Sequence, residues 1–205
     1  MNEIKVACPA GSGMNFALYL LKPSFNYEVG FFGAGHERSD IIEEVPTLVI
    51  LRDPYDAIAS GAERFLRSSG HVYFKDSPFL MQDENIAEIV SIIVGQESTY
   101  LKFFTNIENL GHVKILTFDT LVNNPELFVK MVAEHFNIKS SIKQVDIKEV
   151  LKSVVDSGNA NRLPRETSPS RKTIDRYMRA LYLPNEFKSL KVYLSLKEKI
   201  EKGLV

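Results

Sequence analysis

Short apolar runs alternate along the chain with longer stretches in which apolar residues recur at helical spacing. The short runs predict strands at Glu3–Cys8, Asn26–Phe32, Thr47–Leu51 and His112–Phe118. The longer stretches predict helices at Met14–Lys22, Tyr55–Ser68, Asn85–Asn106, Pro125–Phe136 and Val145–Val155, followed by a charged helical tail from Lys172 to Lys202 that is broken near Pro184. Because strands and helices alternate, we predict a three-layer α/β/α fold around a central parallel sheet of four to five strands.

Three segments that could carry chemistry each follow a predicted strand. They are Pro9–Gly13, Gly33–His36 and Arg52–Pro54, and we expect the second to be a flexible loop. In parallel sheets ligands bind outside the carboxyl ends of the strands, so these segments should lie on one rim. The polar segments Ser69–Asp83 and Asp156–Ser170 are predicted to be irregular, and the first is a candidate lid.

Composition narrows the class of protein. The chain has 205 residues, 44% hydrophobic and 25% charged, as expected for one globular domain over residues 1–205. With 25 basic and 26 acidic residues the net charge is −1, which argues against a nucleic-acid partner. A single cysteine, Cys8, excludes an intrachain disulfide and a cysteine-based zinc site, and we expect no metal. Neither a secretory signal nor a membrane span is evident, so we expect a cytoplasmic protein without a membrane partner.

The glycine-rich segment Pro9–Phe16 lies between a predicted strand and a predicted helix. Its glycines allow an anion to approach the backbone, and the following helix would point its N–H groups at that anion. The candidate phosphate-binding residues are Ala10, Gly11, Ser12, Gly13, Met14 and Asn15. The alternative is a plain strand–helix turn. Because no Gly-Lys-Ser/Thr follows, the segment is not a Walker A motif.

A second candidate anion contact begins at Arg52, at the end of a predicted strand. The planar guanidinium can bind a phosphate bidentately, and the hydroxyl of Ser60, eight residues later in the following helix, could face the same phosphate. In the alternative interpretation Arg52 pairs with Asp53 or Asp56, and Ser60 is a small packing residue.

The string Arg-Asp-Pro-Tyr-Asp-Ala-Ile-Ala-Ser at Arg52–Ser60 closely resembles the 3′-phosphate motif of sulfotransferases that use 3′-phosphoadenosine 5′-phosphosulfate (PAPS). Pro9–Phe16 resembles the 5′-phosphosulfate loop of the same family, and Phe118–Pro125 with the helix after it looks like a later family segment. The resemblance covers about residues 3–138. It implies a P-loop NTPase-like sulfotransferase fold and binding of PAPS or its product, adenosine 3′,5′-bisphosphate (PAP).

The resemblance has two departures. The family loop usually carries a lysine or arginine where this chain has Gly11, and Arg38 could replace that cation or instead pair with nearby glutamates. The family's C-terminal Arg-Lys-Gly signature is not clearly present. Arg171 and Lys172 could supply equivalent charge to the cofactor, or could be a solvated charge pair.

Sulfuryl transfer to a hydroxyl benefits from a base with a pKa near neutrality. The family often has a catalytic histidine after the second strand, and His36 holds that position, with His71 in reserve and a surface histidine as the alternative. We therefore predict a PAPS-dependent sulfotransferase acting on a hydroxyl or amine of a small-molecule or glycan acceptor, as a monomer or homodimer. The alternatives are a small nucleotide or metabolite kinase and a catalytically inactive, nucleotide-binding relative of sulfotransferases.

Overall fold

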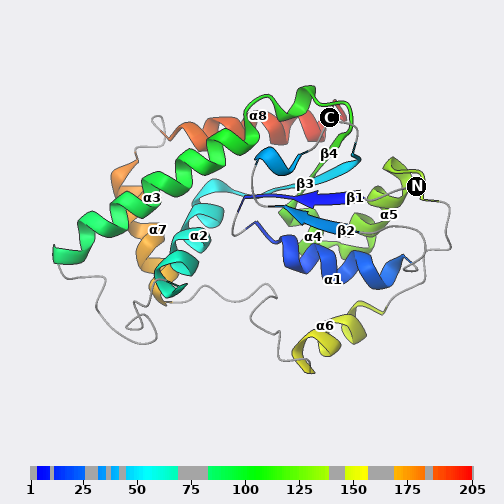
Figure 1. Cartoon of the computed structure of the whole chain (residues 1–205), viewed down its shortest axis with the longest axis horizontal. Helices are drawn as coiled ribbons and strands as arrows, with labels where there is room; N and C mark the ends of the chain where they lie inside the picture. The colour runs from blue at the N-terminus through cyan, green and yellow to red at the C-terminus, as the bar shows by residue number, and fades with distance from the viewer. Residues whose placement is uncertain are drawn as a thin grey trace.

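The computed structural model describes residues 4–9, 12–25, 32–35, 38–41, 45–68, 83–138, 146–156, 169–182 and 187–204. Within these ranges a parallel sheet of four strands has the order β2-β1-β3-β4 (Figure 1). The strands are β1 (Ile4–Ala7), β2 (Phe32–Gly35), β3 (Thr47–Leu51) and β4 (Val113–Thr117). At their carboxyl ends Ala7 pairs with Gly35 and Val49, and Leu51 pairs with Thr117.

Helices cover both faces of the sheet. One face packs against α1 (Met14–Ser24), α4 (Phe118–Asn123) and α5 (Pro125–His135), with α6 (Ile147–Asp156) beside α1. The other packs against α2 (Pro54–Ser68), α3 (Asp83–Phe104), α7 (Pro169–Leu181) and α8 (Lys188–Glu201). Short 3₁₀ turns, η1 (Arg38–Asp40) and η4 (Ile107–Asn109), lie in the connections.

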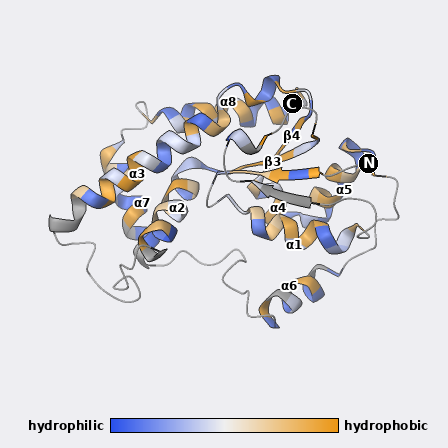
Figure 2. Cartoon of the chain, viewed as in Figure 1, coloured by the Kyte–Doolittle hydropathy of each residue, from blue (hydrophilic) through white to orange (hydrophobic). Residues whose placement is uncertain are grey.

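The strand pleat divides the core into two parts, because successive side chains point to opposite faces. Val6 and Leu48 belong to the cluster beneath α1, whereas Ala7 and Val49 belong to the cluster beneath α2, and all four are fully buried. Colouring by hydropathy shows orange stretches on the helix sides that meet the sheet (Figure 2). The predicted parallel sheet flanked by helices is therefore confirmed.

The second strand extends through a segment that we expected to be a loop. Gly33, Ala34 and Gly35, predicted to be a flexible loop, form β2 with Phe32, and residues 26–31 lie outside the described residues. The segment pairs residue by residue with β1, from Ile4 opposite Phe32 to Ala7 opposite Gly35. Backbone pairing with a neighbouring strand thus overrides the low strand propensity of glycine.

Other element boundaries match or differ slightly. Strand β3 has the predicted bounds, and the charged tail forms α7 and α8. Helix α7 begins at Pro169, inside the segment predicted to be irregular up to Ser170. Helix α4 was not predicted; it is capped by Thr117, whose Oγ1 accepts a hydrogen bond from the Thr120 amide at 3.1 Å. None of the described helices is long and apolar enough to cross a membrane.

Candidate functional site

Strands β1 and β3 are neighbours in the sheet but lead to opposite faces. From β1 the chain enters α1 on one face and continues to β2, whereas β3, on the other side of β1, leads into α2 on the opposite face. The two connections part at the carboxyl ends of these strands, which is where ligands bind in open α/β sheets. The glycine-rich turn after β1 and Arg52 after β3 flank this point.

The glycine-rich turn leads directly into the N-terminus of α1. Gly13 is the N-cap of this helix and has a φ of 92°, which glycine adopts without strain. The Ser12 amide donates to the Pro9 carbonyl at 3.2 Å. Ser12 is 1% exposed, and its Oγ has no hydrogen-bond partner within the described part of the chain. A buried hydroxyl in need of a partner, next to the N–H groups of a helix start, favours an anion at this place.

The other predicted residues of the turn divide into two groups. Met14 and Asn15 form the start of α1, whereas Ala10 and Gly11 lie outside the described residues. Beneath the turn Cys8 is fully buried, and this burial raises the pKa of its thiol to about 12. A hydrogen bond from the Met14 amide and the charge of Arg52 oppose that rise. The thiol is therefore neutral at physiological pH, and the positive charge of Arg52 reaches the base of the turn.

Phe118, the first residue of α4, lies between the turn and Arg52. The Cζ atom of Arg52 is 4.2 Å from the centre of the Phe118 ring, in cation–π geometry. On the other side the ring packs against Gly13: a Cβ atom there would be 2.6 Å from Phe118 Cδ2 and closer still to Cε2. Gly13 therefore has no room for a side chain, in addition to its positive φ.

The connection from β3 to α2 is held by hydrogen bonds that involve its own Asp53 and Tyr100 of α3. The Oδ1 atom of Asp53 accepts hydrogen bonds from the amides of Tyr55 at 2.9 Å and Asp56 at 3.4 Å, which is the cap predicted for α2. From α3 the hydroxyl of the buried Tyr100 donates to the Arg52 carbonyl at 2.7 Å. The backbone of Arg52 is thus fixed where the strand ends.

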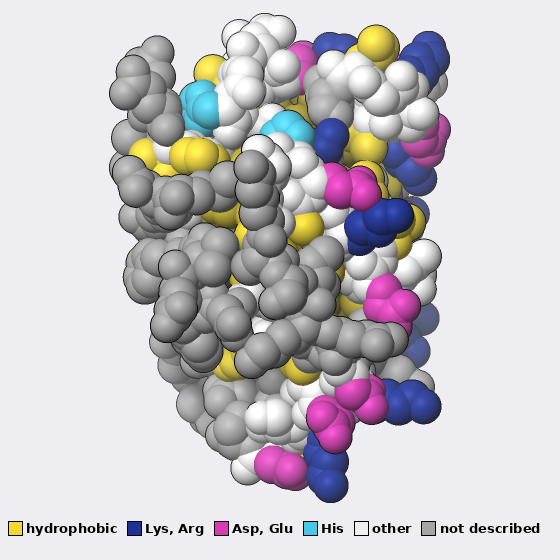
Figure 3. Space-filling model, turned by 90° about the vertical axis from the view of Figure 1, so that its right-hand side faces the viewer, with side chains coloured by type: hydrophobic (Ala, Val, Ile, Leu, Met, Phe, Trp, Pro, Cys, Tyr) yellow, Lys and Arg dark blue, Asp and Glu magenta, His cyan; other side chains and the backbone are white. Residues whose placement is uncertain are grey.

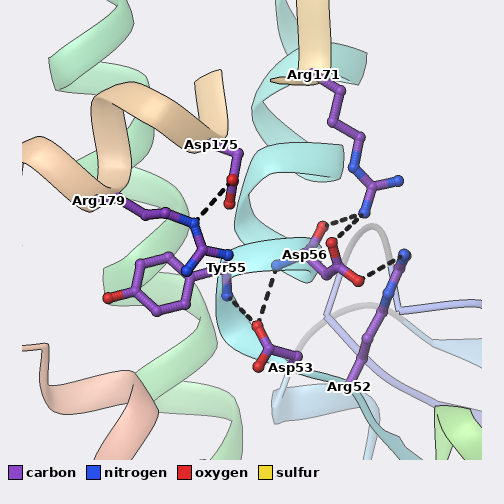
Figure 4. A network of polar contacts seen from close by, with 7 residues as sticks. All are labelled: Arg52, Asp53, Tyr55, Asp56, Arg171, Asp175 and Arg179. Atoms are coloured by element: carbon purple, nitrogen blue, oxygen red, sulfur yellow. Dashed lines mark hydrogen bonds and ion pairs between the residues drawn. The ribbon is translucent and has the colours of Figure 1, made fainter. Parts of the chain in front are cut away.

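Arg52 and Arg171 converge on one carboxylate in the first turn of α2 (Figure 4). Arg52 Nη2 lies 3.5 Å from Asp56 Oδ2. Arg171, from α7, donates through Nη2 to both the backbone carbonyl and the Oδ1 atom of Asp56, each at 3.0 Å. The expected alternative partner of Arg52 is therefore present, and its phosphate contact remains a prediction.

Electrostatics at this point favour a further negative charge. The side chains of Arg52 and Arg171 are 12% and 13% exposed, so Arg171 is not the solvated charge considered as its alternative. Burial, and then the charge of Arg171, lower the pKa of Arg52 to about 10, while Asp56 opposes this effect. With a pKa of about 10, Arg52 keeps its positive charge at neutral pH in the presence of Arg171, Asp53 and Asp56.

A surface pocket lies beside Asp56 and Arg171, between α2 and α7. It is lined by Asp56, Arg171, Lys172, Asp175, Arg176 and Arg179. Arg179 binds Asp175 at 2.9 Å and lies 4.5 Å above the ring of Tyr55 (Figure 4).

The surface at the opposite end of the molecule, where β1 begins, is shown in Figure 3. Acidic and basic side chains are interspersed over the part of this surface that is described. Among the described residues no group of three or more His, Cys, Asp or Glu is arranged to hold a metal ion.

For two of the remaining predicted site residues, Ser60 and Lys172, the structure gives a position in the fold. Ser60 is half-buried in α2 one helical turn after Asp56, so both lie on one helix face. Lys172 is exposed beside Arg171 in the first turn of α7. His36 and His71 lie outside the described residues, and His36 directly follows Gly35, the last residue of β2.

Arg38, which was considered as a replacement for the cation missing at Gly11, influences Glu108 instead. Burial would raise the pKa of Glu108, but the ammonium of Lys199 at 2.9 Å and the charge of Arg38 lower it. Glu108 belongs to η4, which precedes the amino end of β4, whereas the turn lies at the carboxyl ends of the strands. The charge of Arg38 therefore acts near Glu108, at the opposite end of the sheet from the turn.

Comparison with known proteins adds little to this geometry. No family model and no curated protein matches the chain. Among solved structures it is similar to a sulfotransferase from Alicyclobacillus acidocaldarius, with 11% sequence identity and a TM-score of 0.39, over 87% of this chain and 96% of that one. A similarity of this size does not establish a family, so function has to be inferred from the site itself.

Proposed function

We propose that this protein is a sulfotransferase that binds PAPS and moves its sulfuryl group to a hydroxyl or amine of an acceptor. The observation that carries the proposal is the convergence of Arg52 and Arg171 on the first turn of α2, next to the start of α1. Two partly buried guanidiniums beside one helix start, at the point where the chain leaves adjacent strands for opposite faces, suit a ligand with two separate phosphate groups.

In this proposal each anionic end of the cofactor has its own partners. The 5′-phosphosulfate binds over Ala10–Asn15, where the amides at the start of α1 and the Ser12 hydroxyl supply donors. The 3′-phosphate binds Arg52, Ser60, Arg171 and Lys172. A phosphate dianion carries more charge than the Asp56 carboxylate, so it competes for both guanidiniums.

Transfer requires one bond to form and one to break at sulfur. The acceptor oxygen or nitrogen attacks the sulfur atom in line, the bond from sulfur to the 5′-phosphate oxygen breaks, and PAP leaves with the electron pair. His36 takes the proton of the acceptor as general base. Positioning and electrostatic stabilisation supply most of the rate enhancement. Because Gly11 leaves the turn without its usual cation, the charge of Arg52, which reaches Cys8 beneath the turn, compensates in part.

Gly11 also supports a second candidate function. A protein that binds PAP without transferring sulfate would need the two phosphate subsites but no cation at the position of Gly11. A kinase is disfavoured, because the lysine that bridges β- and γ-phosphates in a Walker A motif is absent.

Calorimetric titration with PAP and with ATP plus magnesium tests the proposal. We expect PAP to bind and the R52A variant to lose about 1.5–3 kcal/mol of binding free energy, the range for a charge-assisted contact. R64A, which removes an exposed arginine later in α2, is the matched control and should bind PAP normally. Binding of ATP alone would refute the proposal. PAP binding without transfer from labelled PAPS to a broad acceptor panel would favour the second candidate.

A further inference from the structure

The ring of Phe118 touches both halves of the proposed cofactor site. One face lies 4.2 Å below the guanidinium carbon of Arg52, and an edge packs against the backbone of Gly13 so closely that no Cβ would fit. Gly13 is the N-cap of α1, and Arg52 directly follows β3, the strand that precedes α2. A single side chain from a third strand end therefore joins the two loops that are to hold the two ends of the ligand.

Phe118 differs from an ordinary core residue. Its neighbours Leu116 and Leu121 are 1% and 0% exposed, whereas Phe118 is only partly buried. Phe118 is the first residue of α4, and the N-cap of this helix is Thr117. The Oγ1 atom of Thr117 lies 2.8 Å from the Oγ1 atom of Thr120, which fixes the start of the helix. A phenyl ring at the surface of the core, held at its backbone and in contact with a charged group, is placed to position that group.

We propose that Phe118 is a positioning residue that sets the spacing between the turn at Gly13 and the guanidinium of Arg52. This inference rests on the proposed function, because it assigns the spacing to the two phosphate groups of one nucleotide. The rigid ring fills the space between a helix N-cap and a cation, so a displacement of either loop is felt by the other. The aromatic face is needed for the guanidinium, and the ring volume is needed for Gly13.

If Phe118 positions both loops, its replacement should weaken binding of both adenosine monophosphates. If it positions one loop, only one affinity should change. We would titrate wild type and variants with adenosine 5′-phosphate, adenosine 3′-phosphate and PAP, following binding by nuclear magnetic resonance (NMR). The F118L variant should weaken both monophosphates by about three- to tenfold, the range of a partly exposed cation–π contact. R171A removes a guanidinium that binds Asp56 in the first turn of α2, and it should weaken the 3′-phosphate alone. F118Y keeps the ring and should restore both affinities.

A second readout needs no ligand. In wild type the ring should shift the Arg52 side-chain Nε–H proton resonance upfield, and this shift should be lost in F118L and kept in F118Y. If F118L does not fold, F118M offers an unbranched side chain of similar size for the same measurements.

The outcomes separate the two proposals. Failure of wild type to bind PAP and both monophosphates would refute the proposed function, and the Arg52 resonance would still report the ring contact. If wild type binds PAP but F118L weakens neither monophosphate, or only one, Phe118 does not couple the two loops. Failure of F118Y to restore the affinities would assign the effect to general disruption of packing and overturn the positioning role.

Discussion

Arg171 makes two hydrogen bonds to Asp56, one to its backbone carbonyl and one to its carboxylate, across 115 positions of sequence. The arginine side chain is 13% exposed and the carboxylate 55%. These contacts fasten α7 to the first turn of α2 and bring a second cation beside Arg52. The C-terminal part of the chain thereby contributes to a candidate site built mainly from strand ends in its first half.

Replacing Arg171 should impair nucleotide binding. We expect R171A to weaken PAP binding by about 1.5–3 kcal/mol, because a charge-assisted phosphate contact is lost. K188A removes an exposed cation from α8, outside the pocket, and should change PAP binding by less than about 0.5 kcal/mol. Calorimetry at fixed ionic strength measures both values, and equal losses in the two variants would mean that Arg171 acts only through the general positive field of the protein.

Adding a methyl group at Gly13 should destabilise the protein. The G13A substitution forces a φ of 92° on alanine and drives its Cβ into Phe118, so we expect a loss of roughly 2–4 kcal/mol in unfolding free energy. Urea denaturation measures the loss. The matched control is G95A: Gly95 is exposed in α3 with nothing within 4 Å of an added Cβ, and the change should stabilise by about 0.5–1 kcal/mol. A G13A protein as stable as wild type would contradict the close packing of the turn on Phe118.

Removing one hydroxyl group from α3 should loosen the connection that carries Arg52. In Y100F the partly buried carbonyl of Arg52 loses its 2.7 Å donor, and we expect the unfolding free energy to fall by about 1–2 kcal/mol. Y193F is the control, because the hydroxyl of Tyr193 makes no hydrogen bond within the described ranges. PAP affinity should also fall in Y100F, and an unchanged affinity would show that this bond supports the fold alone.

His36 should matter for turnover and not for binding. We expect H36A to lower sulfate transfer by about 10²–10⁴-fold with PAP affinity unchanged, as for loss of a general base. H135Q changes an exposed histidine of α5 and should keep full activity. Steady-state kinetics with labelled PAPS compares the variants once an acceptor is found. Retained turnover in H36A would move the base elsewhere, with His71 the next residue to test.

Local signals explain what could be predicted from the sequence. The bounds of β3 follow from one apolar run, and the Asp53 cap follows from an aspartate directly before a proline that starts a helix. The strand structure of Gly33, Ala34 and Gly35 was not predicted, because two of these three residues are glycines and their place in the sheet depends on pairing with β1. The rule that strand ends carry ligands also applies to Phe118, which follows β4 as Arg52 follows β3.

Long-range contacts explain what could not be predicted. No local pattern links Arg171 to Asp56, since the pairing depends on how α7 packs against α2. Tyr100 occupies an ordinary buried position in an amphipathic helix, and only the fold shows that its hydroxyl reaches the Arg52 carbonyl. These contacts decide how positive charge is distributed over the candidate site.

The single thiol of the chain can serve as a reporter of its own surroundings. Because Cys8 is fully buried with a pKa raised from 9.0 to about 12, alkylating reagents should reach it only when the first strand and its turn open. Between pH 9 and pH 12 the unfolded thiol ionises while the folded thiol stays protonated, so the folded state loses stability as pH rises through this range. The rate of alkylation thus measures how often Cys8, beneath the glycine-rich turn, is exposed to solvent. A nucleotide bound at the turn should slow the reaction in proportion to its occupancy.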